Sequence, residues 1–198
     1  MLTGDRNLDM KILNNLDDID LVKACQTNRA ADQICHDQTF WLNRILTKFP
    51  EVPIDVLQKY KGDRTWSEYY INDLRKYKDL KADRPYTDLD AIRMIRNEAN
   101  HPYLKLNDLL GEGAKKGRLD YIILALSRGG DVNTRKGYPL VASAINGDYE
   151  MVKYLVEHGA DVNIRDAIGG ILGMVSNKDT IEYLKSKGAK EIIELGFI

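Results

Sequence analysis

The chain has 198 residues, 43% of them hydrophobic, and its 29 Lys and Arg against 30 Asp and Glu leave a net charge of −1. This apolar content with so little net charge excludes a wholly disordered chain. It also excludes nucleic-acid binding through bulk positive charge, because no excess of cations exists to displace counterions. No apolar run approaches the roughly 20 residues of a membrane span, and the start MLTGDRNLD lacks the apolar stretch of a signal peptide.

Two cysteines, Cys25 and Cys35, are too few for a disulfide framework. We therefore expect two buried, reduced thiols in an intracellular, cytoplasmic protein.

Apolar residues follow helical spacing in several short segments of the first 50 residues. The first stripe consists of Leu8, Ile12, Leu13, Leu16 and Ile19. A second helix can be capped by Asp18 and a third by Thr27 or Asn28, and a fourth amphipathic stretch covers residues 39–49. These segments predict a small helical bundle.

This segment resembles an F-box, the helical module by which substrate receptors dock on a Skp-type adaptor. The matching positions are Leu8, Ile12, Leu13, Leu16, Asp20, Leu21, Cys25, Asn28, Arg29, Phe40 and Trp41. One departure is Gly4-Asp5, which stands where the family has Leu-Pro in its adaptor contact. The resemblance implies adaptor-binding residues at Leu8, Ile12, Leu13, Leu16, Leu21 and Trp41.

Residues 51–105 are predicted to form a helical linker or cap region that packs on both flanking modules. Pro50 and Pro53 end the preceding helix. A capping-box pattern runs from Thr65 to Glu68 and opens one helix, and Thr87 opens another. We expect the aromatic residues here to belong to a core.

The C-terminal part repeats with a period near 30. Gly117 matches Gly147, and the Gly129 and Asp-Val-Asn segment ending at Asn133 recurs at the same offset. A poorer third copy places Gly188 after another 29 residues. A repeat of this length indicates a stacked array whose neighbouring units share one core. Thirteen of the fifteen glycines lie after residue 105, so we place a domain boundary there.

One copy shows how the unit folds. Pro139 can start a short helix, Asp148 can cap a second, and Gly159 can end it in the left-handed conformation. This copy resembles the ankyrin repeat. The matching residues are Pro139, Leu140, Gly147, Gly159, Ala160, Asp161, Val162 and Asn163.

The resemblance implies an all-α fold. Two departures are a hairpin loop shorter than in the family and a third copy whose sequence does not match the family at its first helix. The expected domains are F-box-like helices over 1–50, the linker over 51–105, and about three ankyrin repeats over 106–198. The tail over 190–198 is expected to cap the stack. A target protein is expected at the loop tips and first helices. These positions are Thr134, Arg135, Lys136, Tyr138, Ile164, Arg165 and Asp166, with Ala167 beside them.

Catalytic patterns are missing from the sequence. The histidines His36, His101 and His158 form no pair at metal-ligand spacing, no Cys-x-x-Cys is present, and no glycine-rich phosphate loop occurs. We therefore expect no catalytic residue, no cofactor and no metal.

Three hypotheses remain open. In the first, the chain is a substrate receptor that recruits a target to an SCF-type cullin-RING ubiquitin ligase. In the second, it is an ankyrin-repeat scaffold with no ubiquitin role, and in the third an enzyme lies hidden in residues 50–105. The order of F-box and ankyrin parts resembles proteins encoded by large DNA viruses, which implies the host cytoplasm. None of these hypotheses includes binding to a nucleic acid or a membrane.

Overall fold

The computed structural model describes residues 2–80, 92, 96, 102–164 and 170–191. Every regular element in these residues is helical, which confirms the predicted fold class. Two compact units form, one over Met1–Asp79 and the other over Leu80–Ile198. Among the described helices, none is long and apolar enough to cross a lipid bilayer.

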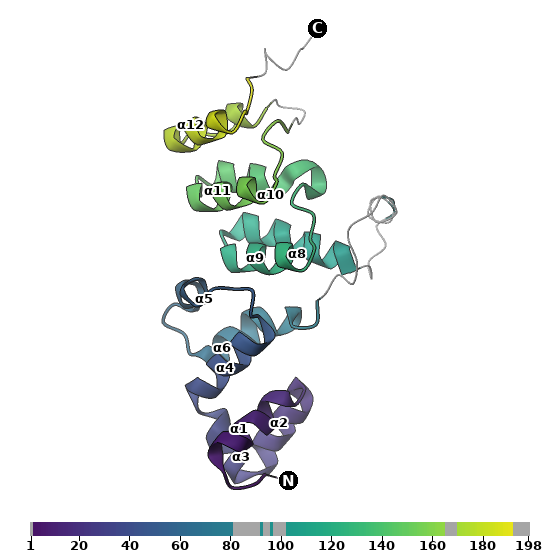
Figure 1. Cartoon of the computed structure of the whole chain (residues 1–198), viewed down its shortest axis with the longest axis vertical. Helices are drawn as coiled ribbons and strands as arrows, with labels where there is room; N and C mark the ends of the chain where they lie inside the picture. Colours follow the sequence, from purple (N-terminus) through teal and green to yellow (C-terminus); the bar gives the residue numbers. More distant parts are fainter. Residues whose placement is uncertain (1, 81–91, 93–95, 97–101, 165–169, 192–198) are drawn as a thin grey trace. The chain divides into compact units, whose positions relative to one another are not determined.

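The first unit is a bundle of short helices (Figure 1). Its elements are α1 (Arg6–Asn15), α2 (Asp18–Thr27), α3 (Arg29–Cys35), α4 (Gln38–Lys48), α5 (Ile54–Lys61), α6 (Trp66–Tyr69), the π-helix η1 (Tyr70–Leu74) and the 3-10 helix η2 (Arg75–Tyr77). Side chains from α1 to α6 and η1 fill one core. Leu13, Leu21, Ile34, Phe40, Ile45, Leu57, Tyr69 and Leu74 are each at most 2% exposed.

Most helix starts in this unit carry the caps that the sequence indicates. Asn28 accepts hydrogen bonds from the first backbone amides of α3, and Thr65 and Glu68 form the predicted capping box of α6. The predicted cap of α2 was wrong by one residue. Asp17 accepts the amide of Asp20 at 2.8 Å, and this frees the Asp18 side chain to bind elsewhere.

The second unit stacks pairs of helices (Figure 1). The first pair is α8 (Pro102–Lys116) with α9 (Leu119–Ser127), and the second is α10 (Thr134–Ile145) with α11 (Tyr149–Glu157). The third is η3 (Ile171–Gly173), a single 3-10 turn, with α12 (Lys178–Ser186). From residue 170 onward, the described part of this copy begins with that one turn, and the Gly-Gly sequence at residues 169–170 has low helix propensity.

The repeat copy over residues 139–163 folds as the sequence predicts. Asp148 caps α11 by accepting the amide of Met151 at 3.1 Å, and Gly159 has φ +91° after its end. The shortened hairpin is replaced by a left-handed turn. Arg135, Lys136 and Gly137 all have positive φ before α10 continues as a right-handed helix.

Some predicted features lie outside the described residues. These are the helix start at Thr87, His101, the loop residues Arg165, Asp166 and Ala167, and the tail after Glu191.

Candidate functional site

A fully buried arginine on α4, Arg44, contacts three other elements of the first unit. The guanidinium of Arg44 donates to the carbonyls of Asn14 and Leu16, each at 2.9 Å, at the end of α1. It also donates to Asp18 Oδ1 at 2.8 Å at the start of α2, and it lies 5.5 Å from the ring centroid of Tyr70 on η1. Arg44 thus satisfies carbonyls that the end of a helix leaves without partners.

The Asp18 carboxylate accepts hydrogen bonds from three side chains that lie in other parts of the first unit. Besides Arg44, it accepts hydrogen bonds from the Tyr70 hydroxyl at 2.8 Å and from Lys78 Nζ at 2.7 Å. Burial alone would raise the pKa of Asp18, but hydrogen bonds from Lys78, Arg44 and Tyr70 outweigh burial and lower this pKa. Burial, with Asp18 as a further cause, raises the pKa of Tyr70 to about 12. These hydrogen bonds favour the ionised carboxylate. The cluster therefore stabilises the packing of the helices that it connects.

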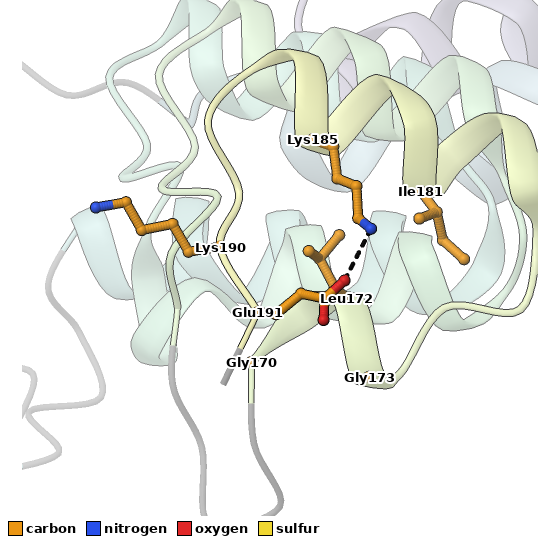
Figure 2. Close-up of a pocket in the computed structure, with 7 residues that line it drawn as sticks. All are labelled: Gly170, Leu172, Gly173, Ile181, Lys185, Lys190 and Glu191. Atoms are coloured by element: carbon orange, nitrogen blue, oxygen red, sulfur yellow. Dashed lines mark hydrogen bonds and ion pairs between the residues drawn. The ribbon is translucent and has the colours of Figure 1, made fainter. Parts of the chain in front are cut away.

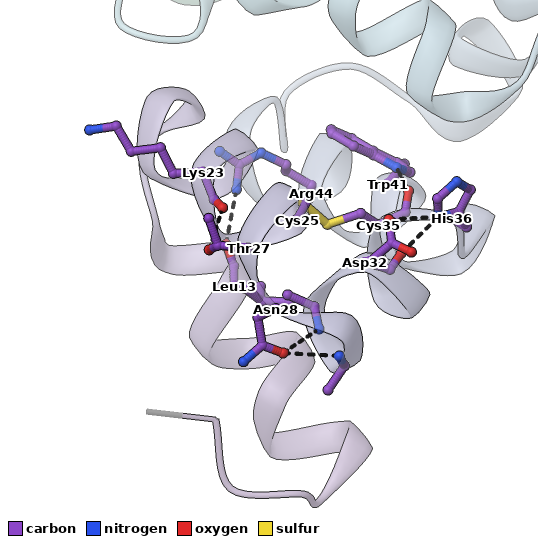
Figure 3. Close-up of a disulfide and its surroundings, with 12 residues drawn as sticks. Leu13, Lys23, Cys25, Thr27, Asn28, Asp32, Cys35, His36, Trp41 and Arg44 are labelled. Carbon is purple, nitrogen blue, oxygen red and sulfur yellow. Dashed lines mark hydrogen bonds and ion pairs between the residues drawn. A yellow bond between two sulfur atoms is a disulfide. The ribbon is translucent and has the colours of Figure 1, made fainter.

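The two cysteines form a disulfide, so the prediction of two reduced thiols was wrong (Figure 3). Helices α2 and α3 pack against each other across Asn28, and this places the Cα atoms of Cys25 and Cys35 6.2 Å apart. That separation lies in the range that a disulfide can bridge. Next to the bridge, the indole Nε1 of Trp41 donates to the carbonyl of Cys35 at 2.7 Å.

The six residues that the F-box resemblance implies divide into two groups. Leu13, Leu21 and Trp41 are buried in the core of the first unit, where they cannot meet a partner without unfolding. Leu8 is 47% exposed, and Ile12 and Leu16 are half-buried. The sequence could not separate the two groups, because apolar spacing along a helix does not show which side chains the packing of the other helices covers.

Helix α2 adds two apolar side chains that the predicted set lacked. Ile19 is 68% exposed and Val22 is 48% exposed. We call Leu8, Ile12, Leu16, Ile19 and Val22 the α1–α2 apolar residues. Three of the five, Leu8, Ile19 and Val22, are exposed.

Gly4 and Asp5 start α1 instead of providing an apolar contact. Gly4 has φ +85°, and the carboxylate of Asp5 accepts the amides of Asn7 and Leu8 at 2.9 and 3.0 Å. The dipeptide therefore acts as a turn and an N-cap.

The predicted target-binding residues also divide. Thr134 and Ile164 are buried, whereas Arg135, Lys136 and Tyr138 are exposed. Arg135 forms an ion pair with Asp108 on α8. Sequence reasoning missed Ile145, which is 58% exposed and follows Tyr138 by seven residues, so the two lie on one face of α10. The sequence signal for this face was the helical spacing of Tyr138, the half-buried Val141 and Ile145.

The left-handed turn fits against the next repeat. A Cβ placed on Gly137 would lie 1.9 Å from Cδ1 of Ile164, and its φ of +73° already favours glycine. Asn133, Lys136, Gly137, Asp161, Asn163 and Ile164 line a shallow hollow at this junction.

Asparagine side chains join the repeats at equivalent positions. Asn133 donates to the carbonyl of Gly159 at 3.1 Å and accepts the amide of Asp161 at 2.8 Å. Asn163 makes the same pair of bonds to Gly188 and Lys190, at 3.2 and 3.0 Å. The repeated Asp-Val-Asn segment thus has a physical role, because it holds each loop to the next one.

A second groove lies at the third pair, between η3 and α12 (Figure 2). Leu172 and Ile181 contribute apolar surface, and Lys185 forms an ion pair with Glu191 at 2.8 Å. Lys190 points away from the other labelled side chains in Figure 2.

Among the described residues, no group of His, Cys, Asp and Glu is arranged to hold a metal ion. His36 and His158 each contact a backbone carbonyl of their own helix, and the His158 ring stacks on Tyr154 with centroids 3.9 Å apart. Both contacts are local and structural.

Part of the chain matches a known protein family. The family model described as Ankyrin repeat matches residues 138–167, which include most of α10 and all of α11. No curated protein sequence matches the chain. Residues 138–167 are therefore an ankyrin repeat, a module that typically binds other proteins and is typically non-catalytic.

Proposed function

We propose that this chain is a non-catalytic adaptor that recruits a target protein to an SCF-type cullin-RING ubiquitin ligase. The first unit would dock on a Skp-type adaptor through the α1–α2 apolar residues. The repeat unit would hold the target. We place this activity in the cytoplasm, that of the host if the protein is viral.

The observation that carries the docking proposal is the exposure of Leu8, Ile19 and Val22, together with the half-buried Ile12 and Leu16. Leu8 and Ile12 stand on one face of α1, since residues four apart are neighbours on a helix. Their burial against a partner would remove apolar area from water, which is the main favourable term in association.

For the target side, Tyr138 and Ile145 on α10 supply an aromatic and an aliphatic anchor. Arg135 and Lys136 supply charge beside them. Tyr and Arg are enriched among the residues that dominate binding energy. Because Arg135 is already paired with Asp108, a target carboxylate would compete with that contact.

The mechanism follows from holding two proteins at once. A target bound on the repeats and an adaptor bound on α1 and α2 become parts of one assembly. This raises the effective concentration of the target's lysines near the charged ubiquitin-conjugating enzyme. The chain itself forms and breaks no bond.

A second candidate is a binding scaffold with no role in ubiquitylation. Two observations favour it. Three of the six implied adaptor residues are buried in the core, and Gly4-Asp5 forms a cap where the family has its Leu-Pro contact. In this case the first unit would have no role in ubiquitylation.

Calorimetric titration with a purified Skp-type adaptor separates the two. The receptor proposal expects one-to-one binding that Ile12→Asp abolishes and Ile145→Asp leaves unchanged, since both variants place a charge at an apolar position outside the core. Circular dichroism should show both variants folded. Binding that Ile12→Asp leaves intact would refute the site, and no binding up to high micromolar adaptor would favour the scaffold.

A further inference from the structure

A groove of about 810 Å³ runs between α1 and α4 in the first unit. Each helix contributes a row of polar side chains to its walls. The α1 row is Asn7, Lys11 and Asn14, and the α4 row is Thr39, Asn43 and Thr47. Apolar side chains from Met10, Phe40 and Leu46 line the groove between the rows.

The two helices run parallel and are joined at both ends of the groove. Arg6 at the start of α1 forms an ion pair with Asp37, the N-cap of α4. At the other end, Asn14 Nδ2 donates to Thr47 Oγ1 at 3.3 Å. Eight residues of helix separate Thr39 from Thr47, which is roughly 12 Å. At about 3.3 Å per residue, that length matches four residues of extended chain.

The walls hold polar groups that the chain does not use. Within the part of the chain that the structure describes, the carboxamides of Asn7 and Asn43 have no hydrogen-bond partner, and both residues are exposed. A carboxamide offers N–H donors and a C=O acceptor in one plane, which are the groups of a peptide bond. The backbone N–H and C=O groups of a partner helix bond to each other, so a helix would offer no backbone hydrogen bonds to these carboxamides.

The charge of the groove indicates which peptide fits. Arg6 and Asp37 neutralise each other at one end. Lys11 is exposed and has no ion-pair partner among the described residues, so the centre of the groove is positive. A peptide carboxylate placed there would gain a charge-assisted contact.

We propose that this groove binds an extended, acidic segment of a partner protein. The peptide backbone would bond to Asn7 and Asn43, one apolar side chain would pack on Met10 and Leu46, and one carboxylate would meet Lys11. The proposal does not depend on the adaptor role, because it uses the side of α1 that faces α4 and none of the α1–α2 apolar residues.

The test is a nuclear magnetic resonance titration of the full ¹⁵N-labelled chain with a peptide pool of sequence acetyl-Xaa-Leu-Xaa-Glu-Xaa-amide. We expect shifts confined to the amides of α1 and α4 and to the Asn7 and Asn43 side chains. Asn43→Leu and Lys11→Glu should each weaken binding about tenfold or more, because each variant removes a hydrogen-bond or charge partner of the peptide. Asn15→Leu makes the same change on α1 outside the groove and should leave binding unchanged.

Two modified peptides test the chemistry. Methylation of the backbone nitrogens between Leu and Glu removes the donors and should abolish binding. Glu→Gln in the peptide should weaken binding to the native chain but not to Lys11→Glu. The absence of shifts at millimolar peptide, equal affinity for Asn43→Leu, or shifts of the groove amides that follow protein concentration alone would each overturn the proposal. The last result would assign the groove to a second copy of the chain.

Discussion

Single residues decide how closely the repeats approach. Gly137 and Gly147 have nearly the same left-handed backbone, with φ of +73° and +71°. They differ in their surroundings, since a Cβ on Gly137 meets Ile164 and one on Gly147 meets nothing within 4 Å. This pair separates the cost of the backbone conformation from the cost of a steric clash.

We predict that Gly147→Ala destabilises the second unit by about 1 kcal/mol, the cost of a left-handed non-glycine residue. Gly137→Ala should cost about 3 kcal/mol, because overpacking against Ile164 adds to the same backbone term. Hydrogen exchange of the α11 amides measures both. Equal costs would mean that Ile164 does not pack against Gly137.

Asp18 predicts a pH dependence of the first unit. Its pKa is lowered from 3.8 on folding, so the unfolded chain binds the proton more readily. The stabilisation from this carboxylate is therefore full above pH 3.8 and is lost as the pH falls below that value through the folded pKa. Arg44 and Lys78 supply the donors that produce the effect.

The check compares native chain with Asp18→Asn by urea unfolding from pH 6 to pH 2.5. Trp41 and Trp66 are the only tryptophans and both lie in the first unit, so their fluorescence follows that unit alone. The free energy of unfolding of the native chain should exceed that of Asp18→Asn by a constant amount near neutral pH, and this difference should decrease in acid. An advantage that does not change with pH would show that Asp18 does not titrate differently on folding.

At the scale of elements, the disulfide fixes α2 against α3 (Figure 3). It closes a loop of ten residues in the unfolded chain, so its removal should destabilise the first unit by about 2–3 kcal/mol. Tryptophan fluorescence in urea with and without dithiothreitol measures this. The Cys25→Ser, Cys35→Ser double variant should match the reduced chain and should not respond to dithiothreitol.

The same bridge bears on where the protein works. Cytosolic glutathione keeps most thiols reduced, so a cytoplasmic adaptor would carry Cys25 and Cys35 as thiols in cells. Alkylation of free thiols at lysis, followed by mass spectrometry, reports the state. A fully oxidised pair would contradict the proposed compartment.

Helix periodicity and local caps were readable from sequence because they depend on residues a few positions apart. The capping box at Thr65, the cap at Asp148 and the glycine after α11 were predicted on that basis. The Arg44 cluster was not, since an arginine in an amphipathic helix reads as a surface residue until its distant carboxylate partner is known. The disulfide and the division between Leu8 and Leu13 likewise depend on how helices pack, which spacing alone does not give.

The chain combines two compact units, to which the proposed function gives separate roles. In the proposed function, the first unit would bind an adaptor through the α1–α2 apolar residues, and the second would bind a target through Tyr138 and Ile145. Variants in one unit should therefore leave binding by the other unchanged, because their sites share no residue.

Hydrogen–deuterium exchange of the full chain, free and saturated with a Skp-type adaptor, tests whether the first unit binds the adaptor. We expect protection of backbone amides within α1 and α2, around Leu8 to Val22, with α10 and α11 unchanged. Protection on α10 instead, or no protection anywhere at saturating adaptor, would contradict the receptor function and leave a repeat protein that binds its target alone.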